Sequence, residues 1–343
     1  MNNAEFDNSS AIFNIGYCYE KEIGVEKDPY KAFYNFKRSV HLGYEKGKSN
    51  VEYYMKHKIE DRGLQYWLED AFKDEHIRNI DYSEFSPQTY ISNGAFGIVY
   101  KSEWKDCRKS VAHKCLFKGC LTDEDYKDFV KELKFLRKVD CHPNIIKFYG
   151  VTQDKNGMYN LVLEYANDGT LREYLKKNIK WNDRLKMSRE IAFGLSYLHG
   201  RRIIHRDLHS KNILICEGQP KISDFGLSKN MNDITSNTNG QGLPAYLEPQ
   251  SLKNPKYKRD KKSDIYSFGV IMWEISSGTV PFKDDDYFNI ALKIVNGERE
   301  TPAINTPPQY SKLYKICWEA DPEERPEISS VLNSLNEMCN GIN

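Results

Sequence analysis

The sequence predicts a two-lobed α+β protein, in which a β-rich lobe precedes an α-helical lobe and a short α-helical repeat precedes both. Three observations support this order. Residues 9–57 show a faint helical repeat, residues 87–166 contain short apolar runs typical of strands, and the apolar residues after about 171 recur mostly with a helical period. Because strands come first and helices second, we expect the two types of element in separate lobes.

Residues 9–57 carry an internal repeat in which Ile15 and Val51 occupy equivalent positions, so its period is 36 residues (51 − 15). A period of this length is typical of helix-pair repeats. One helix, a turn at Gly24 and a second helix that ends at Gly43 complete one full unit, and a degenerate second unit follows. The stretch resembles a SEL-type, tetratricopeptide-like repeat.

A single helix pair exposes an apolar face that it cannot cover by itself. Four side chains form this face: Ile15, Tyr19, Phe33 and Phe36. We expect the face to pack on residues 60–85, on the β-rich lobe or on a second chain, so a protein partner or self-association is expected here. Residues 58–86 are charged and are interpreted as a helical linker around YWLEDAF.

Composition limits the class of protein. The 343 residues are 39% hydrophobic, which suffices for packed cores, and Lys+Arg 50 against Asp+Glu 49 leaves a formal charge of +1. No global field therefore favours nucleic acid or an anionic membrane. We expect neither a secretory signal nor a membrane span. The most apolar stretch, residues 265–273, is too short to cross a bilayer and is interpreted as a core helix. The eight cysteines form no Cys-x-x-Cys pair, which predicts reduced thiols in a cytoplasmic protein.

The β-rich lobe is expected to begin with strands in ISNGAFGIVYKSEW (91–104) and SVAHKCLF (110–117), joined by a polar turn. Thr122 is expected to cap the next helix. The apolar stripe of that helix consists of Tyr126, Phe129, Val130 and Leu133. A further strand is expected in NLVLEYA (160–166).

Five motifs follow one another in an order and at spacings that rarely arise by chance. They are ISNGAFGIVYK (91–101), VAHK (111–114), IIHRDLHSKNIL (203–214), DFG (224–226) and WEADPEERP (318–326). Together they resemble the protein kinase family over residues 87–340, and the tyrosine-kinase-like branch, which mostly phosphorylates serine and threonine, fits best. The resemblance implies ATP and Mg²⁺ as cofactors and protein substrates, with signalling as the role.

The resemblance also implies the roles of individual residues. Asp207 would orient the substrate hydroxyl and accept its proton, and Lys211 would neutralise the moving phosphate. Lys114 would hold the α- and β-phosphates and would itself be kept in place by Glu132. Two residues with hard oxygen ligands would bind Mg²⁺, namely Asn212 and Asp224. The other cofactor-binding positions are Ile91, Ser92, Gly94, Phe96, Gly97, Val99, Ala112, Glu164, Ala166 and Leu214.

Two residues depart from the family pattern in ways that affect the nucleotide loop and the substrate platform. Ser92 replaces the first loop glycine, which predicts a stiffer loop and weaker ATP binding. Gln250 follows GLPAYLEP where the family has a glutamate. We therefore expect Arg325 to lose its charge-assisted partner, which would weaken the floor of the platform.

The residues around Asp207 do not decide whether the kinase phosphorylates serine and threonine or tyrosine. Leu243 stands where serine/threonine kinases have a threonine, and His209 where they have a lysine, whereas Lys211 stands where tyrosine kinases often carry a basic residue. We expect serine and threonine, with tyrosine or dual specificity left open. Arg206 is expected to bind a phosphate on the loop after DFG, which offers Thr235, Ser236 and Thr238.

The sequence therefore predicts an Mg-ATP-dependent protein kinase. The alternative is a pseudokinase scaffold, which would bind nucleotide and partners without phosphotransfer. Ser92 and Gln250 favour the scaffold, and the complete set of charged site residues disfavours it, because charges are rarely buried without a use or a partner. A third interpretation makes the repeat a docking module with the kinase as passenger, but about three units are needed for such a module to stand alone.

Overall fold

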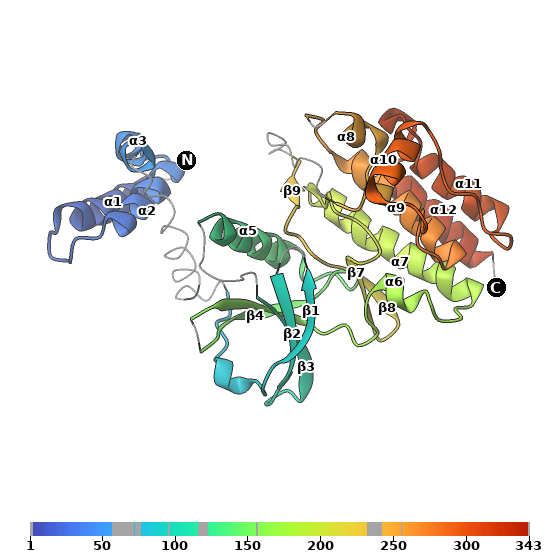
Figure 1. Ribbon diagram of the computed structural model, residues 1–343. Coiled ribbons are helices and arrows are strands. Elements are labelled where there is room, and N and C mark those ends of the chain that lie inside the picture. Colours follow the sequence, from blue (N-terminus) through green and yellow to red (C-terminus); the bar gives the residue numbers. More distant parts are fainter. Residues whose placement is uncertain are drawn as a thin grey trace.

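A computed structural model describes residues 3–56, 72, 77–94, 97–115, 123–155, 157–231, 242–254 and 256–341. Figure 1 shows a small helical unit at the N-terminus, then a lobe built around a sheet, and then a lobe of helices. Strands thus precede helices along the two-lobed part, as the sequence predicts.

The N-terminal unit contains three helices and a short 3-10 turn: α1 (Asn3–Lys21), α2 (Pro29–His41), η1 (Glu45–Gly47) and α3 (Lys48–Lys56). Gly24 has φ +70° in the turn after α1, a conformation that suits glycine. Asp28 then accepts a hydrogen bond from the backbone N–H of Lys31 at 3.0 Å and so caps α2. The turn and the cap produce the helix pair where the sequence predicts it.

The apolar face of this helix pair is covered by α3. Phe33 and Phe36 are buried, and the ring of Tyr54 in α3 lies 5.9 Å from the first and 6.0 Å from the second, between ring centroids. The expectation that this face needs residues 60–85, the small lobe or a second chain is wrong for these phenylalanines, because the degenerate second unit supplies the cover. Ile15 remains 47% exposed.

The small lobe is a five-stranded antiparallel sheet with one long helix, in the strand order β1-β2-β3-β5-β4. Its elements are β1 (Thr89–Gly94), β2 (Gly97–Trp104), β3 (Lys109–Cys115), α5 (Asp123–Val139), β4 (Phe148–Gln153) and β5 (Tyr159–Glu164). The stretch 91–104, interpreted from sequence as one strand, spans the β1–β2 hairpin, because Gly94 pairs with Gly97 at its tip. Thr122 and the side chain of Tyr126 lie outside what the structure describes.

The segment just before β1 packs on the small lobe. Ile77, Ile80 and Phe85 are at most 5% exposed, and the short helical turn η2 (Tyr82–Glu84) lies between the last two. The interpretation of residues 58–86 as a helical linker is therefore wrong for residues 77–86, since their apolar side chains are part of a folded lobe. YWLEDAF lies outside the described residues except for Phe72, which is partly buried.

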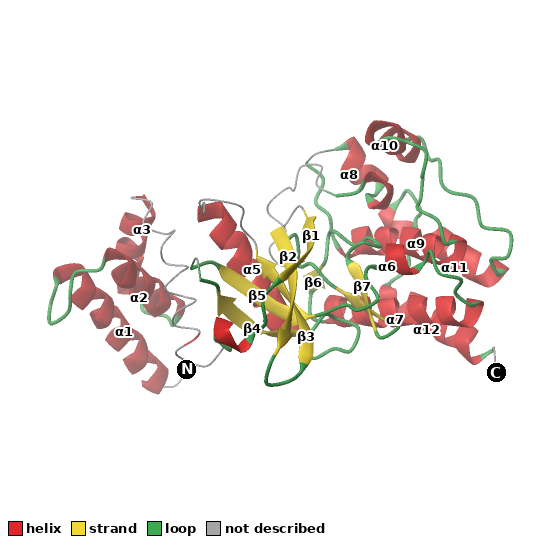
Figure 2. Ribbon diagram, turned by 60° about the horizontal axis from the view of Figure 1, so that its bottom comes forward, coloured by secondary structure: helices red, strands yellow, loops and turns green. Residues whose placement is uncertain are grey.

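The large lobe consists mainly of helices, with two small antiparallel ribbons, β6 with β9 and β7 with β8. In chain order its elements are α6 (Leu171–Tyr174), α7 (Trp181–Gly200), β6 (Ile203–Ile204), β7 (Ile213–Cys216), β8 (Gln219–Ile222), β9 (Lys229–Asn230), η3 (Pro244–Tyr246), α8 (Pro249–Lys253), α9 (Lys261–Ser277), α10 (Tyr287–Val295), α11 (Pro308–Cys317), η4 (Pro322–Glu324) and α12 (Ile328–Asn340). Figure 2 shows α7, α9, α11 and α12 gathered on the side away from the sheet.

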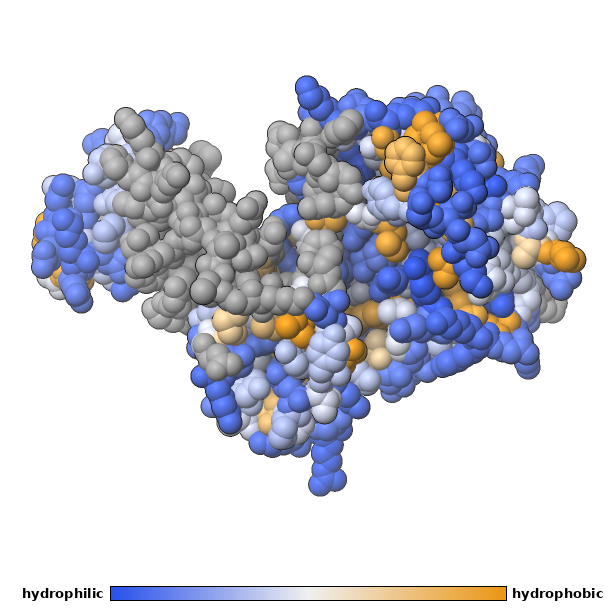
Figure 3. Space-filling view, viewed as in Figure 1, coloured by the Kyte–Doolittle hydropathy of each residue, from blue (hydrophilic) through white to orange (hydrophobic). Residues whose placement is uncertain are grey.

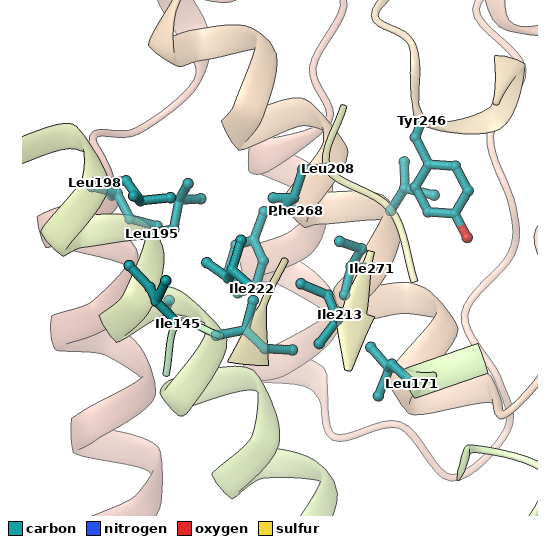
Figure 4. Packing of buried hydrophobic residues seen from close by; sticks show 14 of the residues in the cluster. Ile145, Leu171, Leu195, Leu198, Leu208, Ile213, Ile222, Tyr246, Phe268 and Ile271 are labelled. Carbon is teal, nitrogen blue, oxygen red and sulfur yellow. The ribbon is translucent and has the colours of Figure 1, made fainter. Parts of the chain in front are cut away.

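One apolar cluster forms the core of the large lobe and continues into the small lobe. Figure 4 shows its centre, where Leu195 of α7, Ile213 of β7 and Phe268 of α9 meet. Every residue of α9 from 263 to 275 is buried, which confirms the core helix that the sequence predicts over 265–273. Among the described residues, no helix is long and apolar enough to cross a membrane.

Figure 3 shows a surface with many hydrophilic residues and several apolar areas, one of which lies over α10. Three side chains of α10 are about half exposed or more: Tyr287 at 51%, Phe288 at 74% and Leu292 at 49%. An exposed group of this kind is often an interaction site.

Removing residues 1–86 is expected to destabilise the two lobes more than removing residues 1–71, because only the longer deletion takes away Ile77, Ile80 and Phe85. Burying one side chain of this size contributes about 1.5–3 kcal/mol to the free energy of unfolding. Urea unfolding of the two shortened chains measures the difference directly. Identical unfolding midpoints would show that the segment before β1 adds nothing to the small lobe.

Candidate active site

Lys114 lies at the centre of a buried group of three charges. Its Nζ is 2.7 Å from Oε1 of Glu132 and 3.0 Å from Oδ1 of Asp224, and the side chains of Lys114 and Glu132 are less than a tenth exposed. Burial by itself would lower the pKa of Lys114, but the carboxylates of Asp224 and Glu132 outweigh it and raise this pKa above its ordinary value. The ammonium group therefore remains charged and binds two carboxylates from distant parts of the chain.

The elements around Lys114 explain this meeting. In the sheet, Lys114 of β3 pairs with Val99 of β2 and Leu161 of β5, so its position is fixed by register on both sides. Glu132 lies in α5, and Asp224 follows β8 with a φ of +64°. A non-glycine residue rarely adopts this conformation, and such residues are concentrated at functional sites.

The loop that carries Asp207 is held by a buried carboxylate of α9. Asp264 accepts hydrogen bonds from the backbone N–H of His205 at 2.9 Å and of Arg206 at 2.8 Å, and its Oδ2 is 2.9 Å from Nε2 of His199. Burial would raise the pKa of Asp264, but the hydrogen bond and charge of His199 outweigh it and keep this pKa below its ordinary value. The anion therefore fixes Arg206 at φ +71°, next to Asp207.

Asp207 is buried and keeps its negative charge. Oδ2 of Asp207 accepts a hydrogen bond from Nδ2 of Asn212 at 3.1 Å and lies 3.6 Å from Nε2 of His209. Burial favours the neutral acid, but the hydrogen bond and charge of His209 outweigh it, so the pKa of Asp207 is lowered. An ionised carboxylate can accept a proton at neutral pH, as a general base must.

Two basic residues, His209 and Lys211, follow Asp207 in the chain, and His209 is the one whose side chain lies close to the Asp207 carboxylate. His209 is buried, with its ring 5.9 Å from that of Tyr246 between centroids, whereas Lys211 is exposed. Lys211 as the residue that neutralises the moving phosphate stays a prediction. Leu243 is partly buried, packs on the main core and precedes η3.

Asn212 and Asp224 carry the oxygen atoms that Mg²⁺ would need, and their role as its ligands stays a prediction. The NH₂ group of Asn212 donates to both the backbone O and Oδ2 of Asp207, so its amide oxygen is left as an acceptor. Asp224 adds a partly exposed carboxylate. Among the described residues no cluster of three or more His, Cys, Asp or Glu could hold a metal ion. Few protein ligands, all oxygen, match the preference of Mg²⁺, which retains several waters.

The positions predicted to line the nucleotide cleft lie on elements from both lobes. Val99, Ala112 and the β5 residue Leu163 share the face of the sheet that carries Lys114, since Ala112 pairs with Leu163 and Val99 with Lys114. Leu214 of β7 packs against the same core from the large lobe. These apolar residues bring the two lobes together next to the charged group.

The remaining predicted positions of the nucleotide loop are on the β1–β2 hairpin. Ile91 is 42% exposed at a β-bulge between Tyr90 and Ser92, and a bulge of this kind changes the direction of a side chain. Ser92 is exposed and pairs with Val99. Phe96 lies outside the described residues.

The segment after β5 continues from the sheet toward the large lobe. The backbone N–H of Glu164 donates to the backbone O of Lys147 at 2.9 Å, and the backbone O of Ala166 accepts from the N–H of Gly169 at 3.3 Å. Ala166 also packs on the core that both lobes share. Glu164 and Ala166 as nucleotide-binding positions stay predictions.

Arg206 lies beside a second buried arginine, Arg259, and beside the carboxylate of Asp264. Burial and the neighbouring Arg259 lower the pKa of Arg206 to about 10, and Nη1 of Arg259 donates to the backbone O of Arg206 at 2.8 Å. Two adjacent guanidinium groups would suit an anion. The candidate phosphate carriers Thr235, Ser236 and Thr238 lie outside the described residues, so their contact with Arg206 stays a prediction.

The expectation that Arg325 lacks a charged partner is wrong. Nη1 of Arg325 is 2.6 Å from Oε2 of Glu248, and both side chains are fully buried. The carboxylate also accepts a hydrogen bond from Ser263. Glu248 stands two residues before Gln250, so a position that motif spacing overlooks supplies the negative charge.

A second buried polar network was missed by sequence reasoning. Oγ of Ser210 donates to Oε1 of Glu274 at 2.8 Å, Nη2 of Arg172 donates to the hydroxyl of Tyr246 at 2.7 Å, and this hydroxyl donates to Glu274. The network joins Ser210, three residues after Asp207, to α6, η3 and α9. The available signal was an acid inside the apolar run VIMWEIS, since an isolated charge in such a run needs partners.

Replacing Glu248 by Gln is expected to lower the free energy of unfolding by about 3–5 kcal/mol, because it leaves the buried guanidinium of Arg325 without its counter-charge. Gln250→Glu is the matched control, since Gln250 is only partly buried, and it is expected to have little effect. Chemical unfolding at pH 7 measures both. A larger loss of stability in Gln250→Glu than in Glu248→Gln would contradict the assigned pairing.

Comparisons with known proteins agree with this geometry. A family model described as protein tyrosine and serine/threonine kinase matches residues 86–335. A probable serine/threonine-protein kinase of Dictyostelium discoideum is 36% identical over 266 residues, which cover 76% of this chain and 28% of the relative.

Two animal proteins show a similar match. Mitogen-activated protein kinase kinase kinase 7 of Drosophila melanogaster is 33% identical over 269 residues, covering 76% of this chain and 38% of the relative. Mitogen-activated protein kinase kinase kinase 13-A of Xenopus laevis is 33% identical over 278 residues, which cover 80% of this chain and 27% of the relative. This chain thus spans well under half the length of these relatives. It belongs to the family of protein tyrosine and serine/threonine kinases.

Proposed function

We propose that this chain transfers the γ-phosphoryl group of Mg-ATP to serine or threonine hydroxyls of protein substrates. The observation that carries the proposal is the buried contact of Lys114 with Glu132 and Asp224, next to an ionised Asp207. Phosphoryl transfer depends on positioning and charge neutralisation, and this group of residues supplies both. The relatives named as serine/threonine kinases support the choice of hydroxyl.

The negative charge of the site supports a metal-nucleotide cofactor. Lys114 carries one positive charge and contacts two carboxylates, so the group has an excess of negative charge. A bound Mg²⁺ would offset the negative charge of Asp224. Bound Mg-ATP supplies the phosphoryl group and the metal that neutralises its oxygens. In this chain Asn212 and Asp224 would hold the metal, and Lys114 would hold the phosphates.

Asp207 performs the proton step. The substrate hydroxyl oxygen forms a bond to the γ-phosphorus while the bond from that phosphorus to the β–γ bridging oxygen breaks, and the hydroxyl proton passes to the carboxylate of Asp207. Asn212 and His209 lie on the Oδ2 side of that carboxylate, so Oδ1 is the oxygen left for the substrate.

The structure removes one of the two observations that favour the pseudokinase alternative. Ser92 is still a departure in the nucleotide loop, but the Glu248–Arg325 pair provides the anchor that Gln250 was expected to lack. Every charged residue that phosphotransfer needs is present.

The substrate and partner are proposed to be proteins. Apolar side chains gather over α10, which contacts α8 and η3. Such a group suits a macromolecule better than a small metabolite. The N-terminal helical unit is proposed to be a SEL-type repeat that binds a protein. A cytoplasmic location is proposed because the cysteines among the described residues are free thiols.

Asp207→Asn is expected to lower turnover by about 10²- to 10⁴-fold, the range for loss of a general base, with folding retained. Asp284→Asn, an exposed position, is the matched control and is expected to keep full activity. Phosphate transfer from labelled ATP to a generic protein, followed by phosphoamino-acid analysis, measures both the rate and the acceptor. Unchanged turnover in Asp207→Asn would refute the mechanism, and label on tyrosine alone would refute the proposed acceptor.

A further inference from the structure

The sheet of the small lobe continues past its edge strand β4 into the segment that precedes the lobe. Asn79 forms a parallel bridge with Val151 of β4. The backbone N–H of Ile80 donates to the O of Val151 at 2.8 Å, and the N–H of Val151 donates to the O of Arg78 at 2.9 Å. Residues 77–85, here called the strap, therefore add one short segment to the sheet beside its edge strand β4.

The strap holds both faces of the sheet. Ile77 is 2% exposed and belongs to the same buried cluster as Phe129 of α5, whereas Ile80 is 1% exposed and belongs to a separate cluster. Leu161 and Val162 are neighbours in β5 and belong one to each cluster, so the two clusters lie on opposite faces. A shift of the strap would therefore disturb the buried cluster to which Phe129 of α5 belongs.

A row of aromatic rings reaches from the chain before the strap to the same helix. The ring centroid of Phe72 lies 6.2 Å from that of Tyr159 in β5, and Tyr159 lies 6.3 Å from Phe129. Phe129 comes one helical turn before Glu132, on the same side of α5. Next to Glu132, Nζ of Lys131 donates to the backbone O of Gly226, two residues after Asp224, at 3.0 Å. The helix thus connects the strap side of the lobe with the charged site.

The close approach of the strap to β4 requires a glycine. Gly150 has a φ of +154°, and a Cβ added there would lie 2.4 Å from the backbone O of Arg78 and 3.1 Å from Cδ1 of Ile80. The first distance is far below van der Waals contact, and a backbone atom cannot easily give way. Alanine at this position would therefore push the strap away from β4.

We propose that the strap is a positioning element for phosphotransfer, which keeps Glu132 on Lys114 by packing behind α5. Ile77 and Phe72 are then positioning residues that act through Phe129. The helical unit lies before the strap in the chain, so a partner that binds this unit would alter the active site by moving the strap. The inference rests on the proposed function, since it concerns the control of the same site.

The test uses the full chain with Ile77→Ser and Gly150→Ala. The matched controls are Ile304→Ser, at a fully exposed isoleucine, and Gly157→Ala, at a glycine with φ +80° whose nearest neighbour, Nε2 of Gln153, is 3.8 Å away. Turnover and KM for a peptide are measured below the unfolding temperature, together with hydrogen exchange of the amides of α5 and of α7.

Both strap variants are expected to lose about two- to thirtyfold in kcat, the range for residues that couple to a site through packing, with KM for the peptide unchanged. Amide exchange is expected to become faster in α5 and not in α7. The two controls are expected to match the unchanged chain, and Ile77→Val is expected to restore most of the activity lost in Ile77→Ser.

Unchanged kcat in both strap variants would overturn the proposal, as would equally faster exchange in α5 and α7, since that outcome shows a general loss of stability. The failure of the proposed function is distinguishable. If the unchanged chain transfers no phosphate, phosphotransfer is refuted, and the exchange of α5 still decides whether the strap holds this helix.

Discussion

The active site depends on the contacts that the ammonium group of Lys114 makes with two carboxylates. The ammonium group binds Glu132, 18 residues away in the chain, and Asp224, 110 residues away. Taking three charges out of water is unfavourable, and their attraction offsets this only when the geometry is held by the surrounding structure. The sheet register, the packing of α5 and the left-handed backbone at Asp224 provide that geometry. The lobes are thus joined by charge as well as by apolar packing.

Buried acids in and next to α9 extend this organisation into the large lobe. Asp264 holds the backbone before Asp207, Glu274 holds Ser210, and Glu248 holds Arg325. Each acid has partners, as a buried carboxylate must. A helix whose residues 263–275 are all buried therefore also supports the polar loops, because a rigid core element can fix them.

The sequence predicts the order of the lobes, the core helix and the main charged residues well, since motif spacing and apolar periodicity are local properties. It fails where contacts are set in three dimensions. Gln250 was judged by its motif position, but Glu248 reaches Arg325 from two residues earlier. Similarly, motif spacing gives no sign that His209 is a buried neighbour of Asp207, while the role of Lys211 stays a prediction.

The segment before the small lobe shows the same limit. Ile77 and Ile80 lie in a charged region without clear periodicity, so no local pattern indicates that they pack on opposite faces of a sheet. The repeat was expected to need an external partner because a single helix pair cannot bury Phe33 and Phe36. Tyr54 of the degenerate unit buries them, although its sequence gave a weak repeat signal.

The central claim is that Lys114, Asn212 and Asp224 form a site for a metal-nucleotide complex. The most direct measurement is the affinity for a non-hydrolysable ATP analogue with and without Mg²⁺, in the unchanged chain and in Asp224→Asn. Tighter binding with Mg²⁺ in the unchanged chain, lost in the variant, is the predicted result. Affinity that is the same with and without Mg²⁺ in the unchanged chain would contradict the claim.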